Sequence, residues 1–278
     1  MYTDLWKEFH GAVGCLHLLN ENNIRLATFS GFKVNNYFIT DDNVLNYSRT
    51  EKIKLCFMDS NGLTETTSHE INMEEFRKCI IKEDKSEAKG FIIININGME
   101  AMNGLPGLNI SKNSDIKVGQ EVVVLGHQCD KNILSINPGI ITSNYADSKG
   151  NKYFQLNSSI KKGMSGAPVI DILTGKVIAM IKNNCDEKNK TYYKMNEISK
   201  NNIRILNEAK GNLFVKDIDP FQALIANQYQ IKLLSKTLFN AVRSNEGYAL
   251  DIVDSFHHFF EINPIATKAP VKHNIKIN

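Results

Sequence analysis

Apolar and polar residues alternate over most of the first two thirds of the chain, in short segments bounded by turn residues, and this pattern predicts β-strands. Asn35-Asn36, between two apolar runs, predicts a tight hairpin because asparagine tolerates positive φ. Asn61-Gly62 predicts a second turn. We therefore expect a first β-barrel over about residues 10–100. Its strands are predicted over residues 13–19, 24–34, 37–40, 53–59, 63–71 and 90–96.

A second group of strand-like segments follows over residues 108–200. Its strands are predicted over residues 122–125, 134–143, 152–157, 177–182 and 191–195, with a further strand beginning at Pro168. Many short strands with turn residues between them are typical of Greek-key barrels. The expected fold class is all-β. Two six-stranded Greek-key barrels would form one double-barrel domain over residues 10–200, followed by a C-terminal helical extension.

Beyond residue 200 the apolar period changes from that of a strand to that of a helix. Asp219-Pro220 is a helix-start signal, and a second helix is predicted over residues 248–260. We expect a helical extension over 215–262 and a flexible tail over 263–278. The extension can pack on the barrels, which we favour, or offer a docking surface to a partner. The first helix carries an apolar stripe of period near 3.6, formed by Phe221, Leu224, Ile225, Ile231, Leu234 and Leu238.

The run Gly163-Met164-Ser165-Gly166-Ala167-Pro168 carries the candidate chemistry. Its glycines allow a sharp turn that presents the backbone N–H groups of Gly163 and Ser165 to a developing oxyanion beside the Ser165 hydroxyl. Ser165 is therefore a candidate nucleophile, with Gly163 and Ser165 as the candidate oxyanion hole. The alternative is a plain turn between two strands.

This run resembles the trypsin-like serine peptidases of the chymotrypsin fold, in particular the HtrA/Deg and glutamyl-endopeptidase branches. Three further segments, at residues 29–40, 105–126 and 192–198, are similar to family segments and occur in the family's order. The resemblance covers roughly residues 10–200. It implies the double barrel, with a cleft that either binds a peptide or is closed.

Two of the three catalytic positions depart from the family's pattern. Asn43 stands where the resemblance places the general-base histidine, and Gly90 where it places the buried aspartate. An asparagine amide cannot take up a proton near neutrality, and losing the base lowers turnover by orders of magnitude. By the family's offset, Ser159 would lie at the base of a neutral specificity pocket. The resemblance therefore implies a degenerate member, a pseudoprotease.

The alternative is an active serine endopeptidase that uses Ser165 with a displaced base. For the histidines we expect other roles: His17 in packing, His127 in a loop, and His257 and His258 facing solvent. Asp41 and Asp42 would be weak bases at their reference pKa, and a lysine would need burial to lose its proton. The candidate bases are His17, His127, Asp41, Asp42, Lys161, Lys162, His257 and His258.

Composition and charge exclude several other classes of protein. The net charge of +3 gives no sign of nucleic-acid binding, and no apolar run reaches the ~18 residues of a membrane span. The amino terminus does not resemble a secretory signal. Five cysteines are scattered without a C-x-x-C motif, which argues against a zinc cluster and a disulfide framework. We expect no metal or cofactor, and a cytoplasmic location.

The leading hypothesis is a catalytically inactive interaction or regulatory subunit. Asn43, Gly90 and the added helices motivate it. A protein partner would bind through the C-terminal helices or the vestigial cleft. One setting that fits is a bacterial defence complex of the type III CRISPR kind, in which trypsin-like accessory proteins occur.

Overall fold

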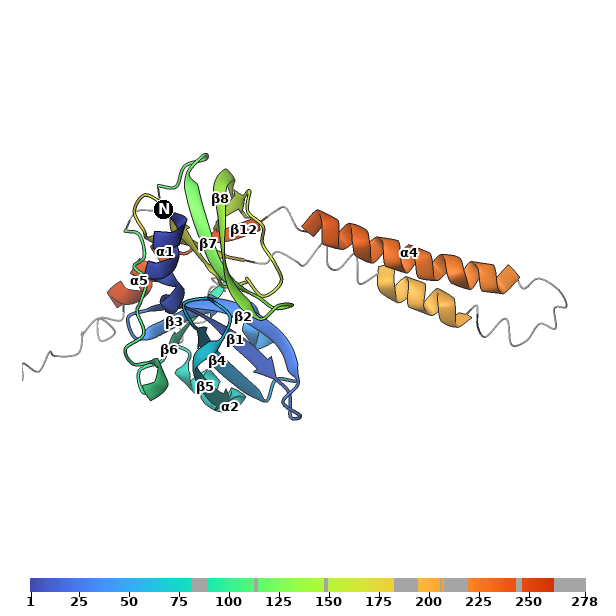
Figure 1. Cartoon of the computed structure of the whole chain (residues 1–278), viewed down its shortest axis with the longest axis horizontal. Helices are drawn as coiled ribbons and strands as arrows, with labels where there is room; N and C mark the ends of the chain where they lie inside the picture. The colour runs from blue at the N-terminus through green and yellow to red at the C-terminus, as the bar shows by residue number, and fades with distance from the viewer. Residues whose placement is uncertain are drawn as a thin grey trace, which may run out of the picture.

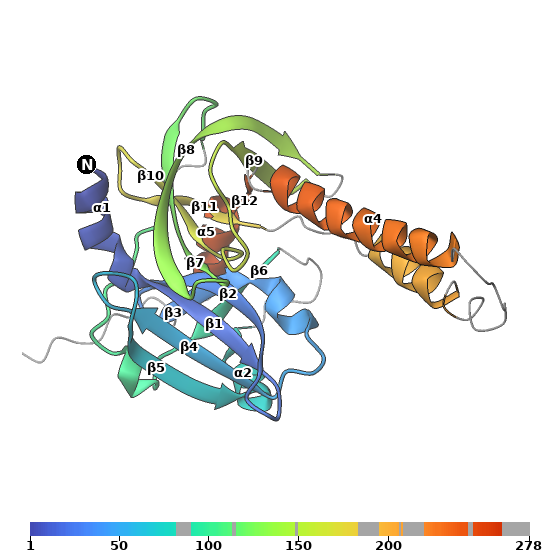
Figure 2. The same ribbon diagram turned by 45° about the vertical axis from the view of Figure 1, so that its right-hand side comes forward.

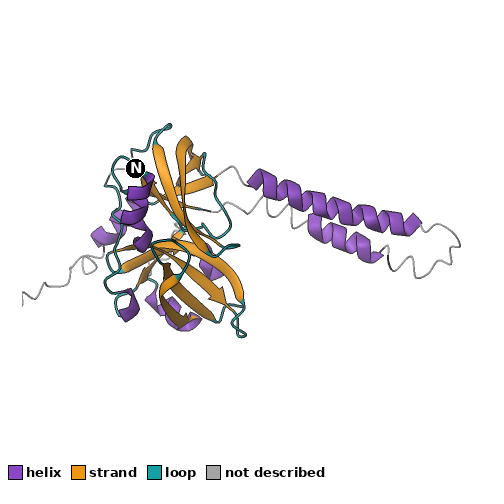
Figure 3. Cartoon of the chain, in the orientation of Figure 1, coloured by secondary structure: helices purple, strands orange, loops and turns teal. Residues whose placement is uncertain are grey.

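The computed structural model places the strands in two stacked β-sheets and sends a pair of helices outward from one of them (Figures 1 and 3). The structure describes residues 1–81, 90–112, 115–147, 150–182, 195–205, 207, 220–243 and 247–262. The expected tail over 263–278 lies outside these residues.

The first sheet has the strand order β5-β4-β1-β2-β3-β6, and all its neighbours pair antiparallel. The predicted strands are confirmed to within two residues at each end. Asn35 has φ of 52°, so the predicted hairpin between β2 and β3 is confirmed as well. Helix α2 (Met73–Cys79), which follows β5, was not predicted. The strands are β1 (Val13–Leu19), β2 (Arg25–Val34), β3 (Tyr37–Asp41), β4 (Lys52–Met58), β5 (Glu65–Asn72) and β6 (Phe91–Asn95).

The second sheet closes into a barrel with the order β10-β11-β12-β9-β8-β7. The expectation of two six-stranded barrels is thus confirmed in part: each half has six strands, and the second sheet closes into a barrel, whereas the first is a six-stranded sheet. Apolar side chains from both sheets, such as Phe32 and Leu125, share one buried cluster between them. The strands are β7 (Glu121–Gln128), β8 (Ile133–Ala146), β9 (Lys152–Leu156), β10 (Pro168–Asp171), β11 (Val177–Ile181) and β12 (Gly247–Asp251).

Strand β12 corrects two predictions. It pairs with β9 and β11, so it closes the barrel where the predicted strand 191–195 was expected to do so. Residues 191–194 lie outside the described residues, and residue 195 begins a helix. The helix predicted over 248–260 is wrong in its first part, because Ala249 and Leu250 are buried in strand pairing. The observed helix, α5 (Val253–Ile262), begins just after β12 and buries Val253 and Phe256.

Two helices lie in the chain between β11 and β12, and we call them the helical arm: residues 195–205 and α4 (Pro220–Arg243). They run side by side and project from the body beside the second barrel (Figures 1 and 2). Ile203 is buried, whereas Leu224, Ile231 and Leu234 of the predicted stripe are exposed. The favoured packing of the extension on the barrels is therefore wrong for α4 and right for α5.

The remaining helices lie against the body. Helix α1 (Tyr2–Phe9) precedes β1 and buries Phe9. Short 3-10 turns are η1 (His10–Ala12), η2 (Asp42–Asn46) and η3 (Glu100–Met102). Within the described residues, no helix is both long enough and apolar enough to cross a membrane.

Candidate functional site

The loop that carries Ser165 is fixed against strand β2 of the first sheet. The Ser30 backbone N–H donates to the Ser165 carbonyl at 2.8 Å, and the Ser30 hydroxyl donates to the Gly163 carbonyl at 2.8 Å. Gly163 and Gly166 have φ of 100° and 89°, values that residues with a Cβ rarely adopt. A Cβ on Gly166 would overlap the Ser30 carbonyl oxygen. The glycines thus let this loop approach the other sheet.

The Ser165 hydroxyl donates a short hydrogen bond to Asp41 Oδ2. Asp41 is the last residue of β3, and its side chain is fully buried. Its other oxygen, Oδ1, accepts from Lys182 Nζ at 2.6 Å and from the Asn43 backbone N–H at 2.8 Å. A carboxylate therefore occupies the place beside the serine hydroxyl.

Lys182 connects this carboxylate to the rest of the site. It follows directly after β11, and its side chain is only 11% exposed. Its ammonium also pairs with Asp42 Oδ1 and donates to the Gly90 carbonyl at 2.8 Å. Ser165, Asp41, Lys182 and Asp42 form one continuous cluster, which we call the serine–aspartate–lysine cluster.

The pKa shifts in this cluster follow from burial and pairing. Burial has the largest effect on Asp41 and raises its pKa, with Lys182 partly opposing it. Burial disfavours the ammonium form of Lys182, but the Asp41 and Asp42 carboxylates outweigh it, so the pKa of Lys182 is raised. Lys182 is therefore protonated at neutral pH and cannot accept a proton from the serine.

The positions singled out by the resemblance lie as follows. Gly90 has φ of 79° and lies against Lys182, so the structure brings it to the same cluster as Ser165. Asn43 lies in η2, and its side-chain oxygen accepts from Asn46 Nδ2 at 2.9 Å. Asn43 reaches the cluster through its backbone N–H alone. Ser159 is exposed, and its role in a pocket stays a prediction.

The other candidate bases are held elsewhere. His17 lies on β1, where its Nδ1 is 2.9 Å from Thr28 Oγ1. His257 donates from Nε2 to the Ser111 carbonyl at 2.7 Å, so the expectation that it faces solvent is wrong. Lys161 and Lys162 are both exposed to solvent. The side chain of His258 lies outside the described residues.

His127 is not in a loop as expected but in the buried strand β7. Burial, together with the nearby His17, lowers the pKa of His127 to about 3. Neither of its ring nitrogens has a hydrogen-bond partner among the described residues. It is therefore neutral at physiological pH.

Sequence reasoning missed Lys182 altogether and weighed Asp41 only as a weak base. One signal was available: Lys182 follows directly after a strand, Val177–Ile181, whose residues are all buried. A charged residue at the end of such a strand needs a counter-charge nearby. Asp41 and Asp42, at the end of another buried strand, are that counter-charge.

A serine on a glycine turn, set between two packed six-stranded sheets, defines the double-barrel class of serine peptidase folds. The model of the trypsin-like peptidase domain matches residues 29–180, which is more than half of the 278 residues. The chain therefore belongs to the trypsin-like peptidase domain family. No curated protein matches the chain by sequence.

Solved structures of similar fold include HtrA-type proteases and Deg5. Deg5 superposes with a TM-score of 0.50 at 16% identity, over 66% of this chain and 84% of Deg5. The HtrA-type protease AlgW with a tripeptide gives a TM-score of 0.49 at 16% identity, over 65% of this chain. A serine endoprotease from Yersinia pestis gives 0.47 at 16% identity, over 66% of this chain and 57% of its own. The chain spans about half, 54%, of the AlgW chain.

Proposed function

We propose that this protein is a non-catalytic trypsin-like protein that acts by binding a protein partner. The observation that carries the proposal is the hydrogen bond from the Ser165 hydroxyl to Asp41, whose second oxygen is held by the Lys182 ammonium. A serine hydroxyl needs a base whose pKa is near the working pH. A carboxylate already paired with an ammonium group is a poor base, so it holds the hydroxyl without activating it.

The cluster also has a structural role. Asp41 ends β3 of the first sheet and Asp42 follows it in η2, whereas Lys182 follows β11 of the second sheet and Ser165 lies in the loop before β10. The ion pairs therefore join the two sheets at the place where an active member needs a mobile proton. With Asp41 fully buried and Lys182 only 11% exposed, water screens this joint little.

The helical arm supplies the binding surface in this proposal. Helix α4 has 24 residues and is therefore about 36 Å long. Exposed apolar surface of this kind marks an interaction site. Leu224 and Ile231 are seven residues apart and Leu234 follows three later, a spacing that suits packing against a helix. The exposed large apolar residues of the arm are Met195, Ile198, Ile205, Leu224, Tyr229, Ile231, Leu233 and Leu234.

The partner proposed is accordingly a protein that presents an amphipathic helix. A bacterial defence complex of the type III CRISPR kind is one setting for such a subunit. The proposal assigns the fold a scaffolding or regulatory task, in which the body is rigid and the arm makes the contact.

The arm is tested with two matched double variants, used as bait against extract of the native host. Ile231→Glu with Leu234→Glu places two charges on the exposed apolar face. Gln222→Glu with Lys236→Gln makes the same change in net charge at exposed polar positions on the other side of the same helix. Quantitative mass spectrometry should show a partner that binds the wild type and the polar control, and whose capture falls at least about tenfold with the apolar variant.

Two outcomes would contradict the proposal. One is equal capture of the partner by both variants, which would place the contact elsewhere. The other is turnover of peptide substrates by the wild type that disappears in Ser165→Ala, which would make the chain an enzyme.

A further inference from the structure

We propose that Cys15, Cys56 and His17 form a site for a thiophilic divalent metal ion, with Zn²⁺ as the natural occupant and Glu65 as the fourth ligand. This inference is independent of the proposed function. The scattered cysteines argued against such a site in the sequence, but strand pairing brings the ligands together.

The register of the first sheet creates the cluster. Cys15 on β1 lies directly opposite Cys56 on β4, and His17 follows two residues along β1 on the same face. The two Sγ atoms are 3.3 Å apart, and Cys15 Sγ is 3.5 Å from His17 Nε2. One donor atom from each of the three residues lies within 4.8 Å of the others. Two residues 41 positions apart in sequence thus point their sulfur atoms at one place.

These separations suit tetrahedral coordination. With Zn–S bonds of about 2.3 Å and Zn–N bonds of about 2.0 Å, neighbouring ligand atoms lie roughly 3.5–3.8 Å apart. The spacing of Cys15 Sγ and His17 Nε2 agrees with this, and the sulfur–sulfur distance is slightly shorter. The same sulfur–sulfur distance is much longer than a disulfide bond of about 2.05 Å. Thiolate and imidazole ligands together favour zinc over calcium or magnesium.

The imidazole is oriented as a ligand would be. His17 Nδ1 lies 2.9 Å from the hydroxyl of Thr28, its direct neighbour on β2. A proton on Nδ1 donated to that hydroxyl leaves Nε2 unprotonated and turned toward the sulfur atoms. Metal-binding histidines are commonly held in this way by a hydrogen bond from their second nitrogen.

Glu65 lies beside the group of three and would complete the ligand set after a change of its side-chain rotamer. Its Oε1 is 3.8 Å from His17 Nε2, and its Oε2 accepts from Lys54 Nζ at 2.5 Å. Two thiolates neutralise a divalent ion, and Lys54 compensates the added carboxylate. Glu65 begins β5, so the four ligands would tie together β1, β4 and β5.

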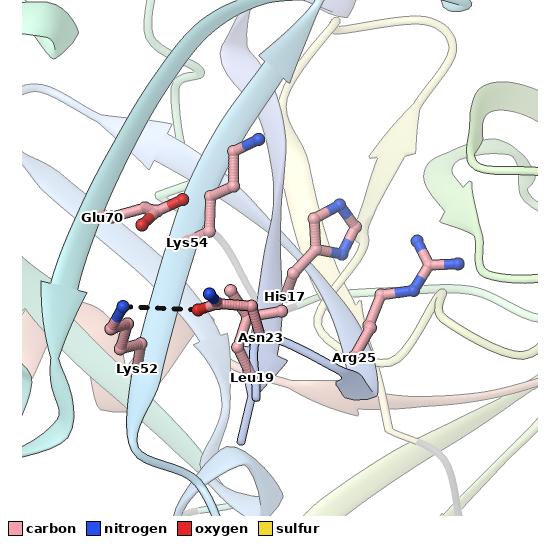
Figure 4. Close-up of a pocket in the computed structure, with 7 residues that line it drawn as sticks. All are labelled: His17, Leu19, Asn23, Arg25, Lys52, Lys54 and Glu70. Carbon is pink, nitrogen blue, oxygen red and sulfur yellow. Dashed lines mark hydrogen bonds between the residues drawn. The ribbon is translucent and has the colours of Figure 1, made fainter. Parts of the chain in front are cut away.

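The site is buried but has a route to solvent. Cys15 and Cys56 are fully buried, and His17 is 5% exposed. His17 also lines an open pocket of about 410 Å³ (Figure 4). In Figure 4 its ring lies between Lys54 and Arg25. An ion can therefore reach the imidazole from the surface, and the closed ligand set predicts a structural rather than a catalytic metal.

The test uses the full chain, purified with reductant, stripped of metal by chelator and titrated with Co²⁺ and then Zn²⁺. We expect one Co²⁺ per chain, with a sulfur-to-metal charge-transfer band and tetrahedral visible bands that Zn²⁺ abolishes. Elemental analysis of protein expressed with zinc should give the same stoichiometry. Cys56→Ser should weaken metal binding at least about tenfold, as loss of a ligand does. Cys79→Ser, which changes a cysteine outside the cluster, should leave it unchanged.

Glu65→Gln keeps the proposal testable where Cys56→Ser fails to fold. It changes a partly exposed side chain and should shift the visible bands and weaken binding without removing the sulfur charge transfer. Absence of cobalt bands in folded, reduced wild-type protein would overturn the proposal. So would bands that persist unchanged in Cys56→Ser, or a Cys15–Cys56 disulfide in protein whose reduced form takes up no metal.

Discussion

The substitution Lys182→Met tests whether the serine–aspartate–lysine cluster holds the two sheets together. It leaves Asp41, which is fully buried, without its cation, while the hydrogen bonds from Ser165 and Asn43 remain. Removing one partner of a buried pair costs about 3–5 kcal/mol. Because two hydrogen bonds to Asp41 survive, we expect the free energy of unfolding to fall by about 3 kcal/mol at pH 7, the lower end of this range. Urea unfolding followed by fluorescence measures this free energy.

The stability loss caused by Lys182→Met should also depend on pH. Burial already raises the pKa of Asp41, and loss of Lys182 removes the charge that opposes this rise. An acid with a raised pKa in the folded state keeps a proton that the unfolded chain has lost, so stability falls as pH rises through that interval. The difference between Lys182→Met and the wild type should therefore be small near pH 4 and full at pH 7.

Two further variants complete this experiment. Lys176→Met removes an exposed lysine from the turn before β11 and should lower the free energy of unfolding by less than about 0.5 kcal/mol. Asp41→Asn combined with Lys182→Met should recover at least half of the loss, because no buried charge is left unpaired. A cost for Lys182→Met no greater than that of Lys176→Met, or one that does not change with pH, would refute the reasoning.

Three other predictions concern the body and the arm. Because the pKa of His127 in the folded state is about 3, the free energy of unfolding of the wild type should fall by about 1.4 kcal/mol per pH unit as pH drops below about 6.5. His127→Phe should abolish this fall, and urea unfolding between pH 7 and 4 measures it. Gly166→Ala should cost more than about 3 kcal/mol and Gly119→Ala about 1 kcal/mol, since both have φ near 90° but only the first would clash; equal losses in chemical denaturation would contradict this. Leu234→Glu on the exposed face of α4 should leave the thermal midpoint of the body unchanged in calorimetry.

Strands of the first sheet could be predicted closely because their signals are local. Residues 13–19, for example, alternate in polarity and end at a turn, and β1 has those bounds. Strand β12 could not be found this way. Its five residues adjoin α5, and their strand conformation depends on pairing with β9 and β11, which lie far away in sequence.

The candidate site could likewise be predicted only where its signals are local. The glycine turn is a local signal, and it identified the loop that places Ser165 against Ser30. The resemblance pointed to Asn43, whereas the side chain beside Ser165 belongs to Asp41, two residues earlier. Which of several neighbouring polar residues faces a serine 124 positions away depends on how the two sheets pack, and periodicity carries no information on this.

The proximity of Cys15 and Cys56 could not be predicted from the sequence either. No spacing rule connects two cysteines 41 residues apart, and their proximity appears only once the register of β1 and β4 is known. For α4 the sequence predicted the helix but not what its apolar stripe contacts. Its period predicted a helix, but the same period is found in helices that pack on their own domain and in helices that bind a partner.

Labelling with a fluorophosphonate probe tests the central claim most directly, because the probe reacts only with an activated serine hydroxyl. Wild-type protein and Ser165→Ala should both keep their unmodified mass after prolonged incubation at neutral pH, while trypsin in the same tube is labelled to completion. Labelling of the wild type that is absent from Ser165→Ala would show that the hydroxyl held by Asp41 is activated, and would contradict the account.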